Sequence, residues 1–240
     1  MRFSFRFRLL PFIAMLIVAA IGISLGQWQL RRAAEKEAIE QRIREREKEP
    51  ALRLEGNAAS AADADALEFR KVTVRGTFLP DWTIYLDNRP YQGKPGFHVI
   101  TPLKIAGSAR HILVARGWIT RDLADRSRIP AIATPAGDVE VTGTVRRHAG
   151  RLLQLGQPAP LKPGAIVQNL DAAQMAQASG LEFEQFIVEQ TGDASDGLVR
   201  DWPRPSLGVD RHLGYAFQWF ALAATAFLFF VVTGFKRASN

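Results

Sequence analysis

Residues Leu9–Leu30 read LLPFIAMLIVAAIGISLGQWQL, a run of 22 residues without a charged side chain. A helix of that length rises about 33 Å at 1.5 Å per residue, enough to cross a hydrocarbon core of about 30 Å. A second uncharged run, Leu213–Phe235, reads LGYAFQWFALAATAFLFFVVTGF near the other end of the chain. Two runs of this length predict two transmembrane helices, because apolar core helices of soluble proteins are usually shorter.

The first run has an alternative interpretation as a cleaved signal peptide, because it follows basic residues and contains small residues such as Ala20. Its apolar segment is longer than a typical signal-peptide core, and a charged helix-forming segment follows it directly, which favours a membrane anchor. Gly22 and Gly26 within this run are four residues apart. This spacing is typical of a helix face that packs closely on another helix.

The excess of basic residues lies at the two ends of the chain. The net charge of +7 could suggest a nucleic-acid partner. Five of the 31 basic residues are terminal: Arg2, Arg6, Arg8, Lys236 and Arg237. Without them, 26 basic residues face 24 acidic ones, so the region between is nearly neutral and no nucleic-acid partner is expected.

Membrane orientation follows from the same charges. Short basic tails are typical of the cytoplasmic side, so we expect tails 1–8 and 236–240 to be cytoplasmic and the domain between the spans to be periplasmic. Arg31, Arg32 and Lys36 carry the opposite signal on the far flank of the first span. The short tails are given more weight, because long segments are translocated largely regardless of their charge.

Between the spans the sequence changes from helical to strand periodicity. Residues 31–49 are rich in strong helix formers and predict a helical stalk that continues from span 9–30. Residues 50–211 predict a β-rich periplasmic domain before span 212–235. Its short connections favour a mainly antiparallel sheet over repeated βαβ crossovers. The predicted fold class is therefore a membrane protein with two terminal transmembrane α-helices flanking a mainly antiparallel β-rich α+β extramembrane domain.

Local signals place elements within this domain. Segment 56–66 is small and polar and is expected to be a loop, while Asp171 is expected to cap a short helix closed by Gly180. The expected strands are 72–78, 83–86, 97–103, 111–119, 138–145, 165–170 and 183–189. Lys71–Phe78 (KVTVRGTF) and Asp138–Val145 (DVEVTGTV) resemble each other. They predict two strand–bulge units with Gly76 and Gly143 at the bulges, or else a chance likeness of strand patterns.

Signatures of known chemistry are mostly missing. The absence of cysteine excludes disulfides, thiol redox chemistry and zinc–thiolate sites. The sequence has no Gly-x-Ser-x-Gly, His-Glu-x-x-His, P-loop or dinucleotide-binding motif, so no enzyme is predicted. A membrane-bound enzyme with an unrecognised site on the β-rich domain stays open as an alternative. His98, His111 and His148 lie on predicted strands or their ends and are expected to be structural or surface residues.

His212 differs from the other histidines because it lies in the first turn of the second predicted span. Tyr215 and Trp219 follow at i+3 and i+7 on the same helix face, and Gln218 adds a polar group beside them. Neutral imidazole is the form that binds a metal or haem iron, and aromatic surface suits a planar ligand. The alternative is an interfacial belt that only sets the depth of the helix in the membrane.

Several segments match a known pattern. Leu25–Arg31 reads LGQWQLR and resembles the Gly-x-Trp-Gln-x-x-Arg signature of the Surfeit locus protein 1 family, the Shy-type cytochrome c oxidase assembly factors. His212–Phe220, read HLGYAFQWF, resembles the start of the last span of that family. Four further segments resemble the central blocks of that family and occur in the same order: Val74–Phe78, Asn88–Pro90, Gly96–Pro102 and Val114–Ile119. The short N-terminal tail resembles bacterial members.

The resemblance implies a function. It implies a chaperone of respiratory-chain biogenesis that serves aa3-type cytochrome c oxidase, binding haem a and assisting its insertion into subunit I. His212 would be the haem axial ligand, and the surrounding residues would be Tyr215, Gln218, Trp219, Trp28 and Gln27. Expected partners are oxidase subunit I, haem a synthase and membrane lipid, and the expected location is the cell inner membrane, crossed twice. The alternative is a membrane-anchored scaffold for oxidase subunits that does not bind haem.

Overall fold

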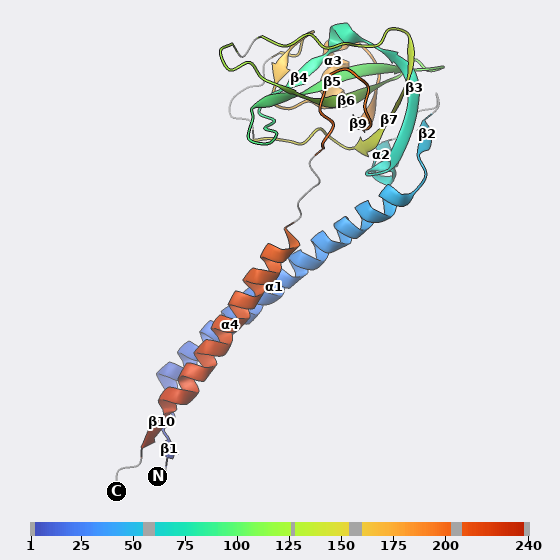
Figure 1. The fold of residues 1–240 in the computed structure, drawn as a ribbon. Coiled ribbons are helices and arrows are strands. Elements are labelled where there is room, and N and C mark those ends of the chain that lie inside the picture. Colours follow the sequence, from blue (N-terminus) through green and yellow to red (C-terminus); the bar gives the residue numbers. More distant parts are fainter. Residues whose placement is uncertain (1–2, 55–60, 126–127, 154–159, 203–207, 238–240) are drawn as a thin grey trace. The chain divides into compact units, whose positions relative to one another are not determined.

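The computed structural model describes residues 3–54, 61–125, 128–153, 160–202 and 208–237. It contains two compact units (Figure 1), a helical unit of Met1–Arg44 with Pro205–Asn240 and a β-rich unit of Glu45–Arg204. The helical unit carries both predicted spans, and the β-rich unit carries the domain between them.

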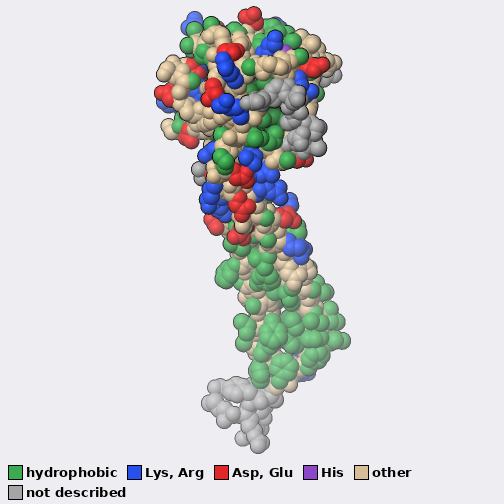
Figure 2. Space-filling model, turned by 90° about the vertical axis from the view of Figure 1, so that its right-hand side faces the viewer, with side chains coloured by type: hydrophobic (Ala, Val, Ile, Leu, Met, Phe, Trp, Pro, Cys, Tyr) green, Lys and Arg blue, Asp and Glu red, His purple; other side chains and the backbone are tan. Residues whose placement is uncertain are grey.

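Two long helices make up the helical unit, α1 (Leu9–Lys48) and α4 (Val209–Gly234). Both are long and apolar enough to cross a membrane. Their apolar side chains point mostly outward, and Leu10 and Phe217 are 81% and 74% exposed. Figure 2 shows these hydrophobic side chains over the helix pair, with charged side chains over the continuation of α1. An apolar surface of this extent is suited to lipid, and the fold is that of a membrane protein, as predicted.

The first helix continues without a break from its apolar part into the charged segment. It ends at Lys48, two residues before Pro50, whose ring and missing N–H cannot extend a helix. The predicted helical continuation of the first span is therefore present.

The two tails of the helical unit pair with each other. Strand β1 (Phe3–Phe5) runs antiparallel to β10 (Phe235–Arg237) at one end of the helix pair (Figure 1). The Phe5 ring packs edge-on against Phe230 and Phe235, with centroid distances of 5.9 and 5.3 Å. Both ends of the chain thus emerge at the same end of the helical unit.

The β-rich unit is built on a closed ring of five strands. Strand β3 pairs with both β7 and β5, so the order β3-β7-β9-β6-β5 returns to β3. These strands are β3 (Lys71–Phe78), β5 (Gly96–Ile105), β6 (His111–Thr120), β7 (Asp138–Arg146) and β9 (Phe183–Gln190). Shorter elements extend the ring: β2 (Leu52–Leu54), β4 (Ile84–Leu86), β8 (Ile166–Val167), α2 (Ala61–Leu67), α3 (Ala172–Ser179) and the 3₁₀ turn Pro80–Trp82.

Most strand pairs in this unit are antiparallel, as predicted. Among the described residues, only β2–β3, β4–β8 and β6–β9 run parallel. Strand β6 has apolar side chains buried on both faces: Ile112 and Val114 join one core cluster, and Leu113 and Ala115 join another. Helix α3 covers the second cluster and forms as predicted, with Asp171 accepting from the Gln174 N–H at 2.8 Å and Gly180 in the left-handed conformation.

Two local predictions are wrong, and one strand was not predicted. Gly76 and Gly143 are not at bulges, since β3 and β7 pair without a register shift. A Cβ atom at these positions would collide with the carbonyl oxygens of Lys104 and Glu189, so glycine is needed where strands of the ring approach closely. Residues 61–66 of the predicted loop form most of α2, and its residues 56–60 lie outside the described chain. The short strand β2 was not predicted.

The bulge lies instead in β6, opposite Val99 and Ile100, where Arg116 is the extra residue. The Arg116 side chain is 1% exposed and donates to Asp196 at 2.9 Å and to Thr134 at 2.6 Å. Burial alone would raise the pKa of the Asp196 carboxyl, but hydrogen bonds, the strongest from Arg200, outweigh it and lower the pKa. This buried network binds Asp196, which lies in the segment before α4, to strand β6.

A second set of contacts holds the end of α1 on the same unit. The Arg46 guanidinium donates to the carbonyl oxygens of Asp65 and Glu68 at the end of α2, and Arg70 forms an ion pair with Glu49. Arginine side chains therefore hold both Glu49, after the end of α1, and Asp196 within the β-rich unit.

We expect Asp196→Ala to lower the free energy of unfolding of the β-rich unit by about 3–5 kcal/mol, because it leaves Arg116 buried without its counter-ion. Denaturant titration of the detergent-solubilised full chain measures this loss. The control is Asp138→Ala, which removes an exposed pair with Arg75 at 3.3 Å and should cost less than about 1 kcal/mol. Equal losses in the two variants would contradict the structural role of the buried network.

Candidate functional site

The site begins with the contact face between α1 and α4. The buried residues of α1 recur at spacings of three, four or seven: Met15, Gly22, Gly26, Gln29 and Ala33. On α4, Ala216 and Ala223 are buried, while His212 and Trp219 are partly buried. These spacings repeat every seven residues on both helices, which is typical of two helices packed along a shared seam.

Glycine makes the close packing along this seam possible. A Cβ atom on Gly22 would lie 2.8 Å from the carbonyl oxygen of Trp219 and 3.0 Å from the Cβ atom of Ala223. On Gly26 it would lie 2.7 Å from the Phe220 ring. The predicted close-packing face of Gly22 and Gly26 is thus confirmed, and its partner is α4.

One polar contact joins the helices along the same seam. His212 Nδ1 lies 2.6 Å from Gln29 Oε1. Gln29 is seven residues after Gly22, and His212 is seven residues before Trp219, so the polar contact lies two helical turns along from the glycine contact. Gln29 is 9% exposed and is the only buried polar side chain in the described parts of α1 and α4.

Burial makes this contact structurally important. An amide that is removed from water without a hydrogen-bond partner costs several kcal/mol in an apolar surrounding. The imidazole of His212 supplies that partner, so the two side chains satisfy each other where the helices meet. An amide oxygen can only accept a hydrogen bond, so Nδ1 carries the hydrogen and Nε2 retains its lone pair.

The structure places some of the predicted site residues on the seam and the others away from it. His212 and Trp219 lie toward α1 on the seam. Tyr215 and Trp28 are 50% and 46% exposed. Gln27 and Gln218 are also exposed and lie off the seam. Because these four side chains are exposed, in a membrane they would face lipid or a partner protein.

Sequence reasoning missed Gln29. The signal was present, because Gln29 continues the spacing of Gly22, Gly26 and Ala33 on one helix face. A polar residue on a small-residue face of a membrane helix indicates an interhelical hydrogen bond. The preceding residues Trp28 and Gln27 are rotated about 100° and 200° away from Gln29 around the helix.

The chemistry of this site suits one metal-bearing ligand held by one imidazole. In the described ranges no group of three or more His, Asp or Glu side chains could hold a bare metal ion. A haem supplies four ring nitrogens itself and needs from the protein only an axial donor such as a neutral histidine. His212 Nε2, with Nδ1 already bonded, fits that requirement.

His98 belongs to the β-rich unit and is structural. Its ring packs edge-on against Trp202 with centroids 5.1 Å apart. Burial, assisted by the charge of Arg89, lowers the pKa of His98 to about 4. The imidazole is therefore neutral at physiological pH and packs as an aromatic side chain.

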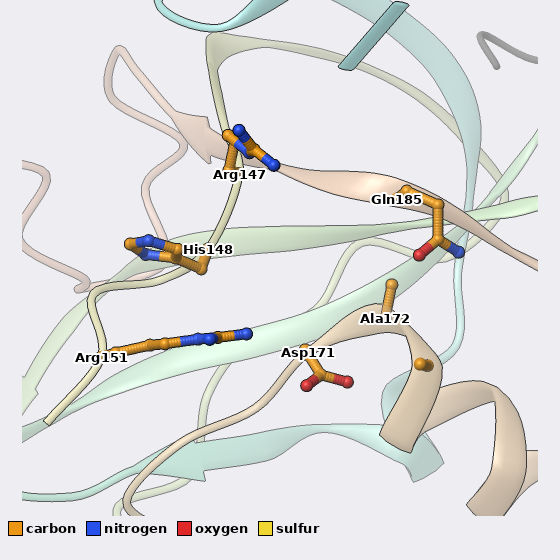
Figure 3. Close-up of a pocket in the computed structure, with 7 residues that line it drawn as sticks. Arg147, His148, Arg151, Asp171, Ala172 and Gln185 are labelled. Atoms are coloured by element: carbon orange, nitrogen blue, oxygen red, sulfur yellow. The ribbon is translucent and has the colours of Figure 1, made fainter. Parts of the chain in front are cut away.

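A cavity of about 490 Å³ opens on the β-rich unit beside the start of α3 (Figure 3). Its polar side chains are Arg147, His148, Arg151, Asp171 and Gln185. Arg147 pairs with Asp65 at 2.6 Å, and the Asp171 carboxylate caps α3. In Figure 3 the side chain of Arg151 extends toward Asp171, while Arg147 and Gln185 lie apart from them.

We expect Gly22→Leu to destabilise the helix pair by about 1–3 kcal/mol, because the new side chain collides with the α4 backbone at Trp219. Sodium dodecyl sulfate titration of the full chain in mixed micelles measures the loss. Ser24→Leu adds the same side chain to an exposed position of α1 and should change little. A similar loss in both variants would contradict the packing assigned to Gly22.

We expect the contribution of His98 to the free energy of unfolding to fall as the pH drops from 6.5 to 4, whereas Glu189, whose pKa burial raises to about 7, contributes in the opposite direction. In that window the unfolded chain protonates His98, whereas the folded protein does not until about pH 4. His98→Phe should remove up to about 3 kcal/mol of this pH dependence in denaturant titrations of the full chain. His148→Phe, at an exposed position, should leave it intact. Parallel pH profiles for His98→Phe and the unsubstituted chain would rule out this assignment.

Comparison with known proteins identifies the chain's relatives. It is 31% identical to the SURF1-like protein of Rickettsia bellii, over 94% of this chain and 90% of the relative. It is also 31% identical to the SURF1-like protein of Rickettsia felis, over 92% and 95%. Surfeit locus protein 1 of Arabidopsis thaliana is 27% identical over 85% of this chain and 72% of its own length.

The matched region includes most of the seam. The family model described as SURF1 family matches residues 16–224, which contain Gly22, Gly26, Gln29 and His212 as well as the whole β-rich unit. With most of its length matched, the chain belongs to the SURF1 family.

Proposed function

We propose that this protein is an assembly factor for aa3-type cytochrome c oxidase that binds haem a and assists its insertion into oxidase subunit I. Membership of the SURF1 family supports the assembly role. The Gln29–His212 contact is the observation that carries the haem part of the proposal, because it engages Nδ1 of His212 and leaves Nε2 of the neutral ring as the nitrogen that can bind a metal.

The helical unit suits a hydrophobic, planar cargo. Exposed aromatic side chains flank the seam at Trp28 and Tyr215, and apolar side chains cover the rest of both helices. A haem held beside the pair would contact these side chains as well as His212. His212 would be the only side chain that binds the iron, and a cargo held by one ligand could be passed to another protein.

The proposed location is the cell inner membrane, with α1 and α4 crossing it, the β-rich unit in the periplasm and both tails in the cytoplasm. The outward-facing apolar side chains and the basic residues Arg6 and Arg8 before α1 support this orientation. The proposed partners are oxidase subunit I, haem a synthase and membrane lipid. The protein acts by binding and delivery, without catalytic turnover.

A scaffold that holds oxidase subunits without touching haem is the second candidate. It is favoured by the β-rich unit, whose buried and partly buried arginine contacts make a folded domain that could bind an oxidase subunit. Under this alternative, His212 serves only as the hydrogen-bond partner of Gln29.

We expect the full chain, co-expressed with enzymes of haem a synthesis and purified in detergent, to carry haem with a characteristic absorption spectrum. His212→Ala should remove most of this haem, because the axial donor is lost. His148→Ala, which changes an exposed histidine of the β-rich unit, should retain it. Haem-free wild-type protein, or full retention by His212→Ala, would favour the scaffold.

A further inference from the structure

Gln29 and His212 form the only polar contact on the seam between α1 and α4 in the described parts of the helical unit. Gln29 is enclosed there, with Gly26 one turn before it and Ala33 one turn after it on the same buried face. A glutamine at the membrane surface could easily turn toward water. The buried placement of Gln29 therefore fixes its amide against the imidazole of the opposite helix.

The identity of the contacting atoms determines the state of the ring. The Gln29 atom is the amide oxygen Oε1, 2.6 Å from His212 Nδ1. Because an amide oxygen has no hydrogen to donate, the neutral ring must carry its hydrogen on Nδ1. The ring nitrogen that remains without hydrogen is Nε2, and its lone pair is available for a bond to a metal.

We propose that Gln29 is a positioning residue, which holds His212 in the Nδ1–H tautomer and presents Nε2 as a donor to a metalloporphyrin. Without an acceptor at Nδ1, a neutral imidazole can carry its hydrogen on either nitrogen and can rotate about its side-chain bonds. Hydrogen bonds to the non-ligating nitrogen of a metal-binding histidine orient the ring and increase its basicity. The ligand part of this inference rests on the proposed haem function, whereas the tautomer does not.

The geometry also gives Gln29 a role that its neighbours cannot share. Gln27 has the same side chain two residues earlier on α1, but it is exposed and lies off the seam. Trp28 is 46% exposed and has no oxygen that could accept a hydrogen bond. Gln27→Leu is therefore a matched control for Gln29→Leu, with the same chemical change on the same helix.

The tautomer is tested by ¹⁵N nuclear magnetic resonance of the full chain in detergent at pH 8, with ¹⁵N in the histidine rings and without any haem. The His212 signals are assigned by their loss in His212→Ala. In the unsubstituted chain and in Gln27→Leu, we expect a protonated Nδ1 and an unprotonated Nε2. In Gln29→Leu we expect the hydrogen to move partly or fully to Nε2.

Gln29→Glu provides the rescue, because its carboxylate also accepts a hydrogen bond from Nδ1 and should restore the Nδ1–H signal. If Gln29→Leu fails to fold, the tautomer of His212 measured in the unsubstituted chain still tests the inference. A hydrogen on Nε2 in the unsubstituted chain, or unchanged signals in folded Gln29→Leu, would overturn the positioning role.

Haem content separates this inference from the proposed function. After co-expression with haem a synthesis enzymes, Gln29→Leu should carry about tenfold less haem than the unsubstituted chain. The Nδ1–H tautomer in a protein that never carries haem would overturn the haem function and leave the positioning of His212 intact. Full haem loading of Gln29→Leu would overturn the role of Gln29 in ligand binding.

Discussion

The close approach of α1 and α4 is the constraint on which the candidate site depends. Gly22 lies against the backbone of Trp219, and this contact leaves no space for a larger residue. Two turns further along the seam, the same register brings Gln29 to His212. If the helices moved apart or shifted by one residue, the amide and the imidazole would both be left without a partner in an apolar surrounding.

The β-rich unit supplies a different kind of rigidity. Its five-stranded ring leaves few free strand edges, and a bulge in β6 turns Arg116 into the interior. There Arg116 binds Asp196 in the segment before α4, while Arg46 at the end of α1 binds backbone oxygens next to α2. These contacts hold residues 46–49 and Asp196 within the β-rich unit.

The candidate site rests on one histidine of the helical unit. Over the part of the chain that the structure describes, no cluster of metal-binding side chains is present, and His98 is a partly buried neutral ring packed against Trp202. The polar cavity beside α3 has its acid and one of its arginines engaged in local contacts. What remains is a single imidazole on an apolar helix pair, held by one amide. Such a site can bind a ligand that brings its own coordination chemistry, and it can release that ligand again.

The sequence by itself determined the features that depend on local composition and periodicity. These are the two apolar helices, the helical continuation to Lys48, the capped helix after Asp171 and most strands of the ring. It also indicated His212, because a histidine at the start of an apolar span is unusual. Only the tertiary structure decided that Gln29, and not Gln27 or Trp28, meets His212, because that choice depends on which face of α1 is turned toward α4. Likewise, Gly76 and Gly143 had the sequence pattern of bulges, but their role follows from carbonyl oxygens supplied by strands distant in the chain.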